Sequence, residues 1–213
     1  MFSPLLPELS DDKVQLISLP DTGEQDYATL STYVAKRLPK VDHILIAQSF
    51  SGPIAAMIAA KDSPNLKAIV FVATFLSPPQ KTLLKFSKLL PITWMARFPF
   101  ASQIHRFMFL GKRAPDDLVR LFQNTIASLD PGLLRKRIVA IESLKILPKK
   151  VDIPVLYLQA SADKLVPTSK VEEFKETFEK LEVLKIMGPH FLLQANPQGC
   201  AKEISKFIST ISM

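Results

Sequence analysis

The sequence predicts an α/β protein, with a mostly parallel β-sheet, helices on both of its faces and a helical insertion. Two apolar runs, at 44–47 and 66–74, have the composition of strands buried on both faces. Strand-like and helix-like patterns alternate along the chain, which favours parallel strands joined by helical crossovers. The stretch from 78 to 150 interrupts this alternation because it is helical throughout. We therefore expect a core of residues 1–77 and 151–213 and an insertion over 78–150.

The first half of the core is expected to hold strands and helices in turn. Residues 13–19 alternate polar and apolar side chains and predict a strand, which ends at the turn residues 20–23. Residues 27–38 carry apolar side chains at helical spacing. The run at 42–48 predicts the central strand, and 51–61 its helix.

The insertion is expected to be a set of short helices, because proline and glycine recur along it. The strand pattern resumes at 153–159. An amphipathic helix is predicted at 168–180, a last strand at 181–187 and a closing helix at 197–211.

Composition indicates a globular chain, because 47% of the residues are hydrophobic and 22% are charged. Its single cysteine, Cys200, excludes an intrachain disulfide and favours a reducing compartment. Cys200 lies at the start of the closing helix, far from any strand end, so we do not expect it to be a nucleophile. The chain opens without a signal-peptide pattern, and its longest apolar stretch, 44–60, is interrupted by polar residues. These features predict a soluble cytoplasmic protein.

A serine follows the central strand where the chain turns into a helix. The local sequence Ala47-Gln48-Ser49-Phe50-Ser51 is similar to the G-x-S-x-G turn that exposes a nucleophilic hydroxyl above a sheet. Both outer glycines are replaced by the next smallest residues, and a close approach of strand and helix requires small side chains. The alternative is an ordinary turn serine before an alanine-rich core helix. Ser51 is a rival nucleophile, although it would place a proline two positions later, inside the first helical turns.

Polar side chains also follow the two strands that come after the insertion. Asp163 lies just beyond the strand at 153–159, and His190 just beyond the strand at 181–187. Because functional groups gather at the carboxyl ends of parallel strands, we expect both side chains near Ser49. Asp163 could instead cap a turn or a helix.

The other histidines fit this position less well. His43 is at the amino end of the central strand, and His105 lies in the insertion. The sequence has no His, Cys, Asp and Glu cluster with metal-ligand spacing and no phosphate-binding glycine loop. We therefore expect neither a metal nor a cofactor.

Three segments together resemble the α/β-hydrolase superfamily, in its serine esterase and lipase branch: IAQSFSG at 46–52, YLQASADKLVP at 157–167 and GPHFLLQANP at 188–197. The resemblance covers essentially the whole chain, and the insertion stands where that family carries its cap.

The resemblance implies a catalytic triad. Ser49 would attack a carbonyl, His190 would accept and return the proton, and Asp163 would orient the imidazole and stabilise its charged form. Phe50 matches the position whose backbone N–H forms half of an oxyanion hole.

The resemblance also exposes a departure at the amino end. Family members begin their sheet with further strands, and a His-Gly-type turn after one of them supplies the second oxyanion N–H. The first residues of this chain, 1–4, correspond to family positions just after that turn, so we expect the chain to lack the N-terminal strands. The family also places a strand between those predicted at 13–19 and 42–48. These two strands would then either pair directly or leave backbone groups unpaired.

The net charge of +7 is concentrated in one segment, because no acidic residue occurs between Asp62 and Asp116. Basic and aromatic residues alternate there: Lys67, Lys81, Lys85, Phe86, Lys88, Trp94, Arg97, Phe98, Phe100, Arg106, Phe107, Phe109, Lys112 and Arg113. One interpretation is a helical cap whose apolar face lines a pocket for a small hydrophobic acyl substrate, with a solvated basic face. The other is docking of the basic face on an anionic membrane surface or an acidic carrier protein. Nucleic acid is disfavoured because no recognition module is present.

These features favour a serine hydrolase that cleaves a carboxylic ester or thioester of a hydrophobic substrate through an acyl-enzyme. The first alternative is a truncated, weak or inactive member of the same fold that acts as a binding protein. A second is other chemistry in the same cavity, such as carbon–carbon bond hydrolysis or acyl transfer. Dehalogenation is disfavoured, because it would require an aspartate in place of Ser49.

Overall fold

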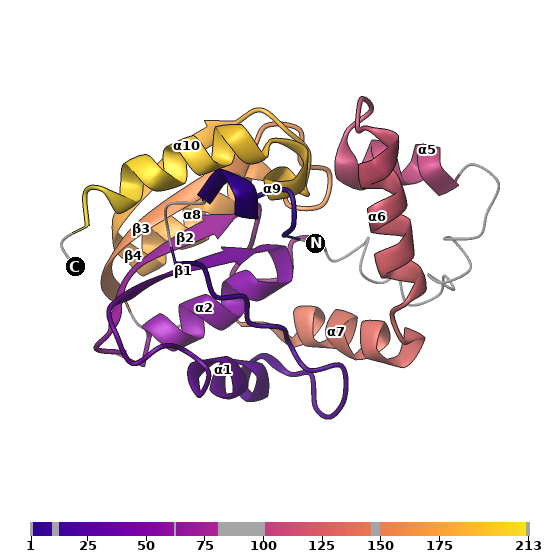
Figure 1. Cartoon of the computed structure of the whole chain (residues 1–213). Helices are drawn as coiled ribbons and strands as arrows, with labels where there is room; N and C mark the ends of the chain where they lie inside the picture. Colours follow the sequence, from indigo (N-terminus) through magenta and orange to yellow (C-terminus); the bar gives the residue numbers. More distant parts are fainter. Residues whose placement is uncertain (1, 10–12, 62, 81–100, 146–149, 212–213) are drawn as a thin grey trace.

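The computed structural model describes residues 2–9, 13–61, 63–80, 101–145 and 150–211. Its core is a four-stranded parallel sheet in the order β1-β2-β3-β4 (Figure 1). The strands are β1 (His43–Gln48), β2 (Leu66–Val72), β3 (Val151–Ala160) and β4 (Phe178–Ile186). Because the strands are parallel, all four carboxyl ends lie at one edge of the sheet. The predicted fold class is confirmed.

Helices cover both faces of the sheet (Figure 1). One face packs against α1 (Tyr27–Ala35), α2 (Gly52–Ala59) and α8 (Val171–Thr177), which follows the short helix η4 (Thr168–Lys170). The other face packs against η1 (Leu6–Leu9), α9 (Leu192–Ala195) and α10 (Pro197–Ile208).

Strand β2 lies in the middle of this packing. Ile69 and Phe71 point into the layer with α1 and α2, whereas Val70 and Val72 point into the layer with α10. All four side chains are fully buried, as expected for a strand covered on both faces.

Between β2 and β3 the chain forms the helical segments α5 (Ala101–His105), η3 (Arg106–Leu110), α6 (Asp116–Ala127) and α7 (Pro131–Ser143). They stand beyond the carboxyl ends of the strands (Figure 1). We call residues 101–145 the helical insertion; the boundaries expected at 78 and 150 stay a prediction.

Four of the expected aromatic residues and four of the basic ones lie outside the described residues: Lys81, Lys85, Phe86, Lys88, Trp94, Arg97, Phe98 and Phe100. No helix in the described ranges is long and apolar enough to cross a membrane.

The strand predicted at 13–19 is wrong. These residues form no regular structure, with Val14 and Leu16 substantially exposed and Ile17 and Leu19 packed on the core. The alternation of Val14 and Leu16 with polar residues therefore does not correspond to a buried face, and only Ile17 and Leu19 contact the core.

Within the part of the chain that the structure describes, β1 pairs with β2 alone, so the alternative in which it pairs with 13–19 does not hold. The central position and the burial on both faces expected for this strand are wrong: β1 lies at the edge of the four-stranded sheet, and Ile44, Leu45 and Ile46 are only partly buried.

The boundary between the predicted helix at 168–180 and the strand at 181–187 also needs correction. Helix α8 ends at Thr177, and Phe178 already belongs to β4, paired with Val151. Phe178 is buried against Phe71 and Phe174, with ring centroids 5.3 and 6.1 Å away. The burial of the Phe178 side chain therefore decides where β4 begins, although the helical spacing of the sequence continues to residue 180.

The exit from β2 towards the insertion is anchored on α8. The carboxylate of Glu173 accepts hydrogen bonds from the backbone N–H groups of Leu76 and Ser77, at 3.1 and 3.0 Å. It also accepts from the Ser77 hydroxyl and from Lys170, both at 2.5 Å. The Glu173 side chain is 14% exposed, so these donors would find little water in its place.

We predict that Glu173→Ala lowers the free energy of unfolding by about 2 kcal/mol, because two backbone donors lose their acceptor. Urea unfolding measures the change. Glu172→Ala is the matched control on the same helix: its ion pair with Lys175 is exposed, and we expect a loss of about 0.5 kcal/mol or less. Equal losses in the two variants would contradict the anchoring role.

Candidate active site

Ser49 lies at the sharp turn between β1 and α2. It begins the short helix η2 (Ser49–Ser51), and its backbone has a positive φ of 53°. Only two non-glycine residues of the described chain have a positive φ, and Ser49 is one of them. Such backbone strain in a non-glycine residue costs about 1–3 kcal/mol and occurs preferentially at functional sites. The turn places the hydroxyl at the carboxyl edge of the sheet.

The replaced glycines of the motif are accommodated locally. Ala47 is buried in the core, and the Ser51 hydroxyl donates to the carbonyl of Gln48 at 2.8 Å. The closest approach in this turn occurs at Gly52, where a Cβ would overlap Oγ1 and Cβ of Thr74. Gly52 is therefore the glycine that the turn requires, and sequence reasoning did not single it out. Ser51, the rival nucleophile, has its hydroxyl bound to the local backbone.

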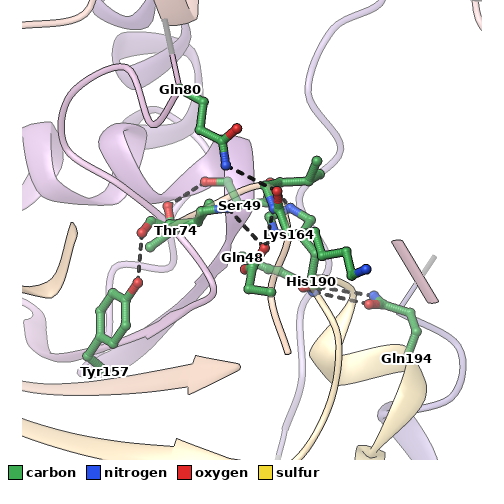
Figure 2. Close-up of polar contacts among 11 residues, drawn as sticks. Gln48, Ser49, Thr74, Gln80, Tyr157, Lys164, His190 and Gln194 are labelled. Carbon is green, nitrogen blue, oxygen red and sulfur yellow. Dashed lines mark hydrogen bonds and ion pairs between the residues drawn. The ribbon is translucent and has the colours of Figure 1, made fainter. Parts of the chain in front are cut away.

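The structure brings Ser49, His190 and Asp163 together. Ser49 Oγ lies 2.8 Å from His190 Nε2, and His190 Nδ1 lies 2.8 Å from Asp163 Oδ2. Because a carboxylate can only accept, Nδ1 carries the proton and Nε2 presents a lone pair to the serine. The His190 and Asp163 side chains are 3% and 4% exposed, so little water competes for these contacts. Figure 2 shows Ser49 and His190 side by side.

Asp163 also shapes the loop after β3. Its Oδ1 accepts from the backbone N–H groups of Leu165 and Val166, at 2.8 and 2.9 Å. The turn-capping interpretation and the histidine-partner interpretation thus hold together, one for each carboxylate oxygen. Capping fixes the carboxylate, so Oδ2 stays aimed at the imidazole.

The two other histidines lie elsewhere. His43 Nδ1 contacts the carbonyl of Val41, 2.8 Å away at the amino end of β1. His105 is buried in the helical insertion with its ring centroid 5.1 Å from that of Phe122, and burial lowers its pKa.

Two buried glutamines join the serine turn to the histidine loop. Gln48 and Gln194 exchange a pair of amide hydrogen bonds, each 3.1 Å long, and Gln48 Nε2 also donates to the carbonyl of His190 at 3.3 Å (Figure 2). Sequence reasoning missed this pair. A polar residue at the end of a buried strand was its only signal, because the partner lies 146 residues away.

Phe50 follows the serine in the first turn of the helix, where backbone N–H groups have no acceptor within the helix. Its ring stacks on Tyr27 with centroids 5.0 Å apart, and the guanidinium of Arg137 in α7 lies 5.5 Å from its centre. Arg137 also donates to Gln25 Oε1 and to the carbonyl of Pro20, both at 3.1 Å. These bonds hold the helical insertion against the core beside the serine.

The helical insertion also contacts the histidine and aspartate loops. The Phe109 carbonyl accepts from the Phe191 N–H at 3.1 Å, and the rings of Phe191 and Phe122 lie 5.1 Å apart. On the aspartate loop, Lys164 Nζ lies 3.0 Å from the centre of the Phe107 ring. The aromatic side chains of the helical insertion therefore contact Phe191 and Lys164, the residues that directly follow His190 and Asp163.

Two further features bear on the chemistry. Burial raises the pKa of the Cys200 thiol to about 12, which leaves it a poor nucleophile at neutral pH. Within the described ranges, no three His, Cys, Asp or Glu side chains are grouped so as to hold a metal ion.

Lys67 is one of the basic residues noted in the sequence. Its Nζ lies 3.2 Å from Asp42 Oδ1, at the amino ends of β1 and β2 and away from this site.

Comparison with known proteins gives a consistent result. A family model described as serine aminopeptidase, S33, matches residues 20–187, which is more than half of the chain. A comparison with curated proteins gave no significant match.

Solved structures of similar fold include the enol-lactonase from Burkholderia xenovorans LB400, with a TM-score of 0.80 and 13% identity over 98% of this chain and 85% of that one. A thermophilic esterase has a TM-score of 0.78 and 17% identity over 99% and 86%. A lipase-esterase related protein from Clostridium acetobutylicum ATCC 824 has 0.73 and 20% over 97% and 88%. At sequence identities of 13–20%, this structural similarity shows that the chain shares the fold of these proteins.

We predict that Gly52→Ala destabilises the protein by about 1–3 kcal/mol, because the added methyl group collides with Thr74 in a fully packed turn. Thermal unfolding measures the loss. Ser51→Gly, at the position where the motif expects glycine, is the matched control and should change stability by about 1 kcal/mol or less. A melting temperature of Gly52→Ala equal to that of the wild type would contradict the close approach.

Proposed function

The chain belongs to the serine aminopeptidase S33 family of the α/β-hydrolase superfamily, and from this we propose that it is a serine hydrolase acting through Ser49, His190 and Asp163. The observation that carries the proposal is the series of two contacts among the three side chains, 2.8 Å from the Ser49 hydroxyl oxygen to the imidazole and 2.8 Å from the imidazole to the carboxylate. Geometry of this kind defines a nucleophile, its general base and the group that orients the base.

The first half of the reaction would form an acyl-enzyme. Ser49 Oγ attacks the carbonyl carbon while its proton passes to His190 Nε2, and Asp163 stabilises the imidazolium. The negative charge on the former carbonyl oxygen would be held by the Phe50 N–H, and a single donor of this kind is worth about 10²–10³ in rate. Collapse of the intermediate expels an alcohol or thiol that takes the proton from His190.

The second half would return the free enzyme. Water gives its proton to His190 Nε2 and attacks the acyl carbon, and the serine leaves as His190 returns that proton. The buried Gln48–Gln194 pair supports both halves, because it holds the histidine loop in register with the serine turn. The proton therefore moves through one fixed imidazole in each step.

We propose a carboxylic ester or thioester of a hydrophobic acyl group as the substrate. Phe191 packs edge-on against His190, with centroids 5.4 Å apart, and continues into the cluster formed with Phe109 and Phe122. These rings would favour an apolar acyl group. Several structural neighbours are described as esterases, whereas the family description names an aminopeptidase. A comparison of p-nitrophenyl esters with aminoacyl p-nitroanilides separates the two substrate classes.

The test of the nucleophile is labelling with a fluorophosphonate probe. We expect the wild type to be labelled, Ser49→Ala not to be labelled, and Ser51→Ala to be labelled like the wild type.

Hydrolysis of p-nitrophenyl butyrate should fall by about 10³–10⁴ in Asp163→Asn, because the imidazole loses the partner that sets its tautomer. A folded wild-type protein that neither labels nor hydrolyses the ester would favour an inactive fold that acts as a binding protein.

The basic surface of the helical insertion supports a further proposal about partners. Residues 101–145 contain eight basic and four acidic residues, and Lys112, Arg113 and Arg120 are exposed. We propose that this surface docks on an anionic membrane or on an acidic carrier protein.

The membrane version predicts co-sedimentation with phosphatidylserine vesicles at low salt and release as salt screens the attraction. The double variant Lys112→Glu/Arg113→Glu should bind more weakly than the wild type. The matched control is Lys202→Glu/Lys206→Glu, which reverses two exposed charges on α10. No sedimentation at low salt would exclude the membrane version.

A further inference from the structure

The two strained residues of the described chain each follow directly after the last paired residues of β1 and β2. Ser49 has a φ of 53° and Ala73 a φ of 45°, the only positive values among its non-glycine residues. Gln48 pairs with Val72 in the last row of the β1–β2 ladder, so Ser49 and Ala73 are the next residues of adjacent strands. Strands β1 and β2 therefore both end at the Gln48–Val72 row, next to Ser49. Thr74 follows Ala73 and connects the turn after β2 to the turn after β1.

Thr74 forms the connection through its side chain. Its Oγ1 donates to the carbonyl oxygen of Ser49 at 2.5 Å, and its own carbonyl accepts from the Tyr157 hydroxyl at 2.7 Å (Figure 2). Thr74 and Tyr157 are 0% and 1% exposed, so water does not replace either bond. Burial raises the pKa of Tyr157, which keeps its hydroxyl protonated as a donor. The chain Tyr157–Thr74–Ser49 thus runs from the centre of the sheet to the serine turn.

The bonded carbonyl belongs to the peptide unit that also contains the Phe50 N–H. A trans peptide is planar, so its C=O and N–H point in opposite directions and rotate together. The Ser49 carbonyl also accepts from the Gly52 N–H at the end of η2, so Thr74 supplies the side-chain part of its restraint. By fixing the carbonyl on the side of Thr74, this bond also aims the Phe50 N–H towards the opposite side. The same bond restrains the strained backbone of the serine itself.

We propose that Thr74 is a positioning residue for the reaction: its hydroxyl sets the orientation of the Ser49–Phe50 peptide, and through it both the nucleophile and the oxyanion donor. This inference rests on the proposed function. Thr74 touches no reacting atom, so its effect passes through the peptide. A donor held in place before the reaction stabilises developing charge without reorganisation in the transition state.

The test uses Thr74→Ser and Thr74→Ala, which differ from each other only in the hydroxyl. Both variants lack the γ-methyl group of threonine, so the difference between them isolates the hydroxyl and its hydrogen bond to the Ser49 carbonyl. We expect Thr74→Ser to keep kcat and the fluorophosphonate labelling rate within about threefold of the wild type. In Thr74→Ala both should fall by a further factor of about 10, the equivalent of one hydrogen bond, with KM unchanged. Rates are taken per folded molecule, with folding checked by circular dichroism.

Crystal structures of the two variants supply a readout that does not depend on activity. We expect the Ser49–Phe50 peptide to keep its orientation in Thr74→Ser and to rotate in Thr74→Ala. Equal rates in the two variants, or an unrotated peptide in Thr74→Ala, would overturn the proposal. A wild type that is neither labelled nor active would overturn the proposed function and with it the role of Thr74 in a reaction, whereas an unrotated peptide in an active Thr74→Ala would overturn the role of Thr74 alone.

Discussion

The turn from β1 into α2 is the constraint on which the rest of this site depends. The chain must leave strand β1 and enter a helix packed on the same sheet within three residues, and Ser49 takes a left-handed backbone conformation to do so. Strain of this size persists only where the surroundings determine the geometry. Here they do: Thr74 binds the Ser49 carbonyl, the Ser51 hydroxyl binds the carbonyl of Gln48, and Gly52 leaves room for Thr74.

The parallel sheet explains why the other two side chains reach this turn. Strands β3 and β4 are neighbours and end at the same edge, so the loops that follow them are in contact. Backbone bonds of 2.9 Å, from Ser161 N–H to the Ile186 carbonyl and from Ala162 N–H to the Gly188 carbonyl, join these loops directly. Asp163 then lies beside His190 before any substrate is present, and the Gln48–Gln194 pair aligns both with the serine turn.

The helical insertion is tied to the core at two places near the site: Arg137 binds the loop before α1, and Phe109 binds the histidine loop. Glu173 anchors the core residues Leu76 and Ser77, which precede the insertion in the chain. The position of the aromatic cluster is therefore set by polar bonds to the core as well as by its own packing.

The sequence by itself determined the fold class, the fully buried strand β2 and the order of serine, aspartate and histidine, but not the partial burial of β1 at the edge of the sheet. It could do so because a strand that is buried on both faces has an almost entirely apolar sequence. In addition, the residues that follow parallel strands all lie at the same edge of the sheet. A local pattern does not show which groups a side chain will contact. For this reason 13–19 resembled a strand although Val14 and Leu16 are exposed, and the helix predicted to reach 180 ends at Thr177.

Tertiary structure alone decided which groups meet. Thr74 and Ser49 are 25 residues apart, and Gln48 and Gln194 are 146 apart. Nothing in their local sequences marks either pair, nor Gly52 as the glycine of closest approach. Hydrogen bonds form between groups that packing brings within about 3 Å, and that proximity exists only once the sheet and its helices have assembled.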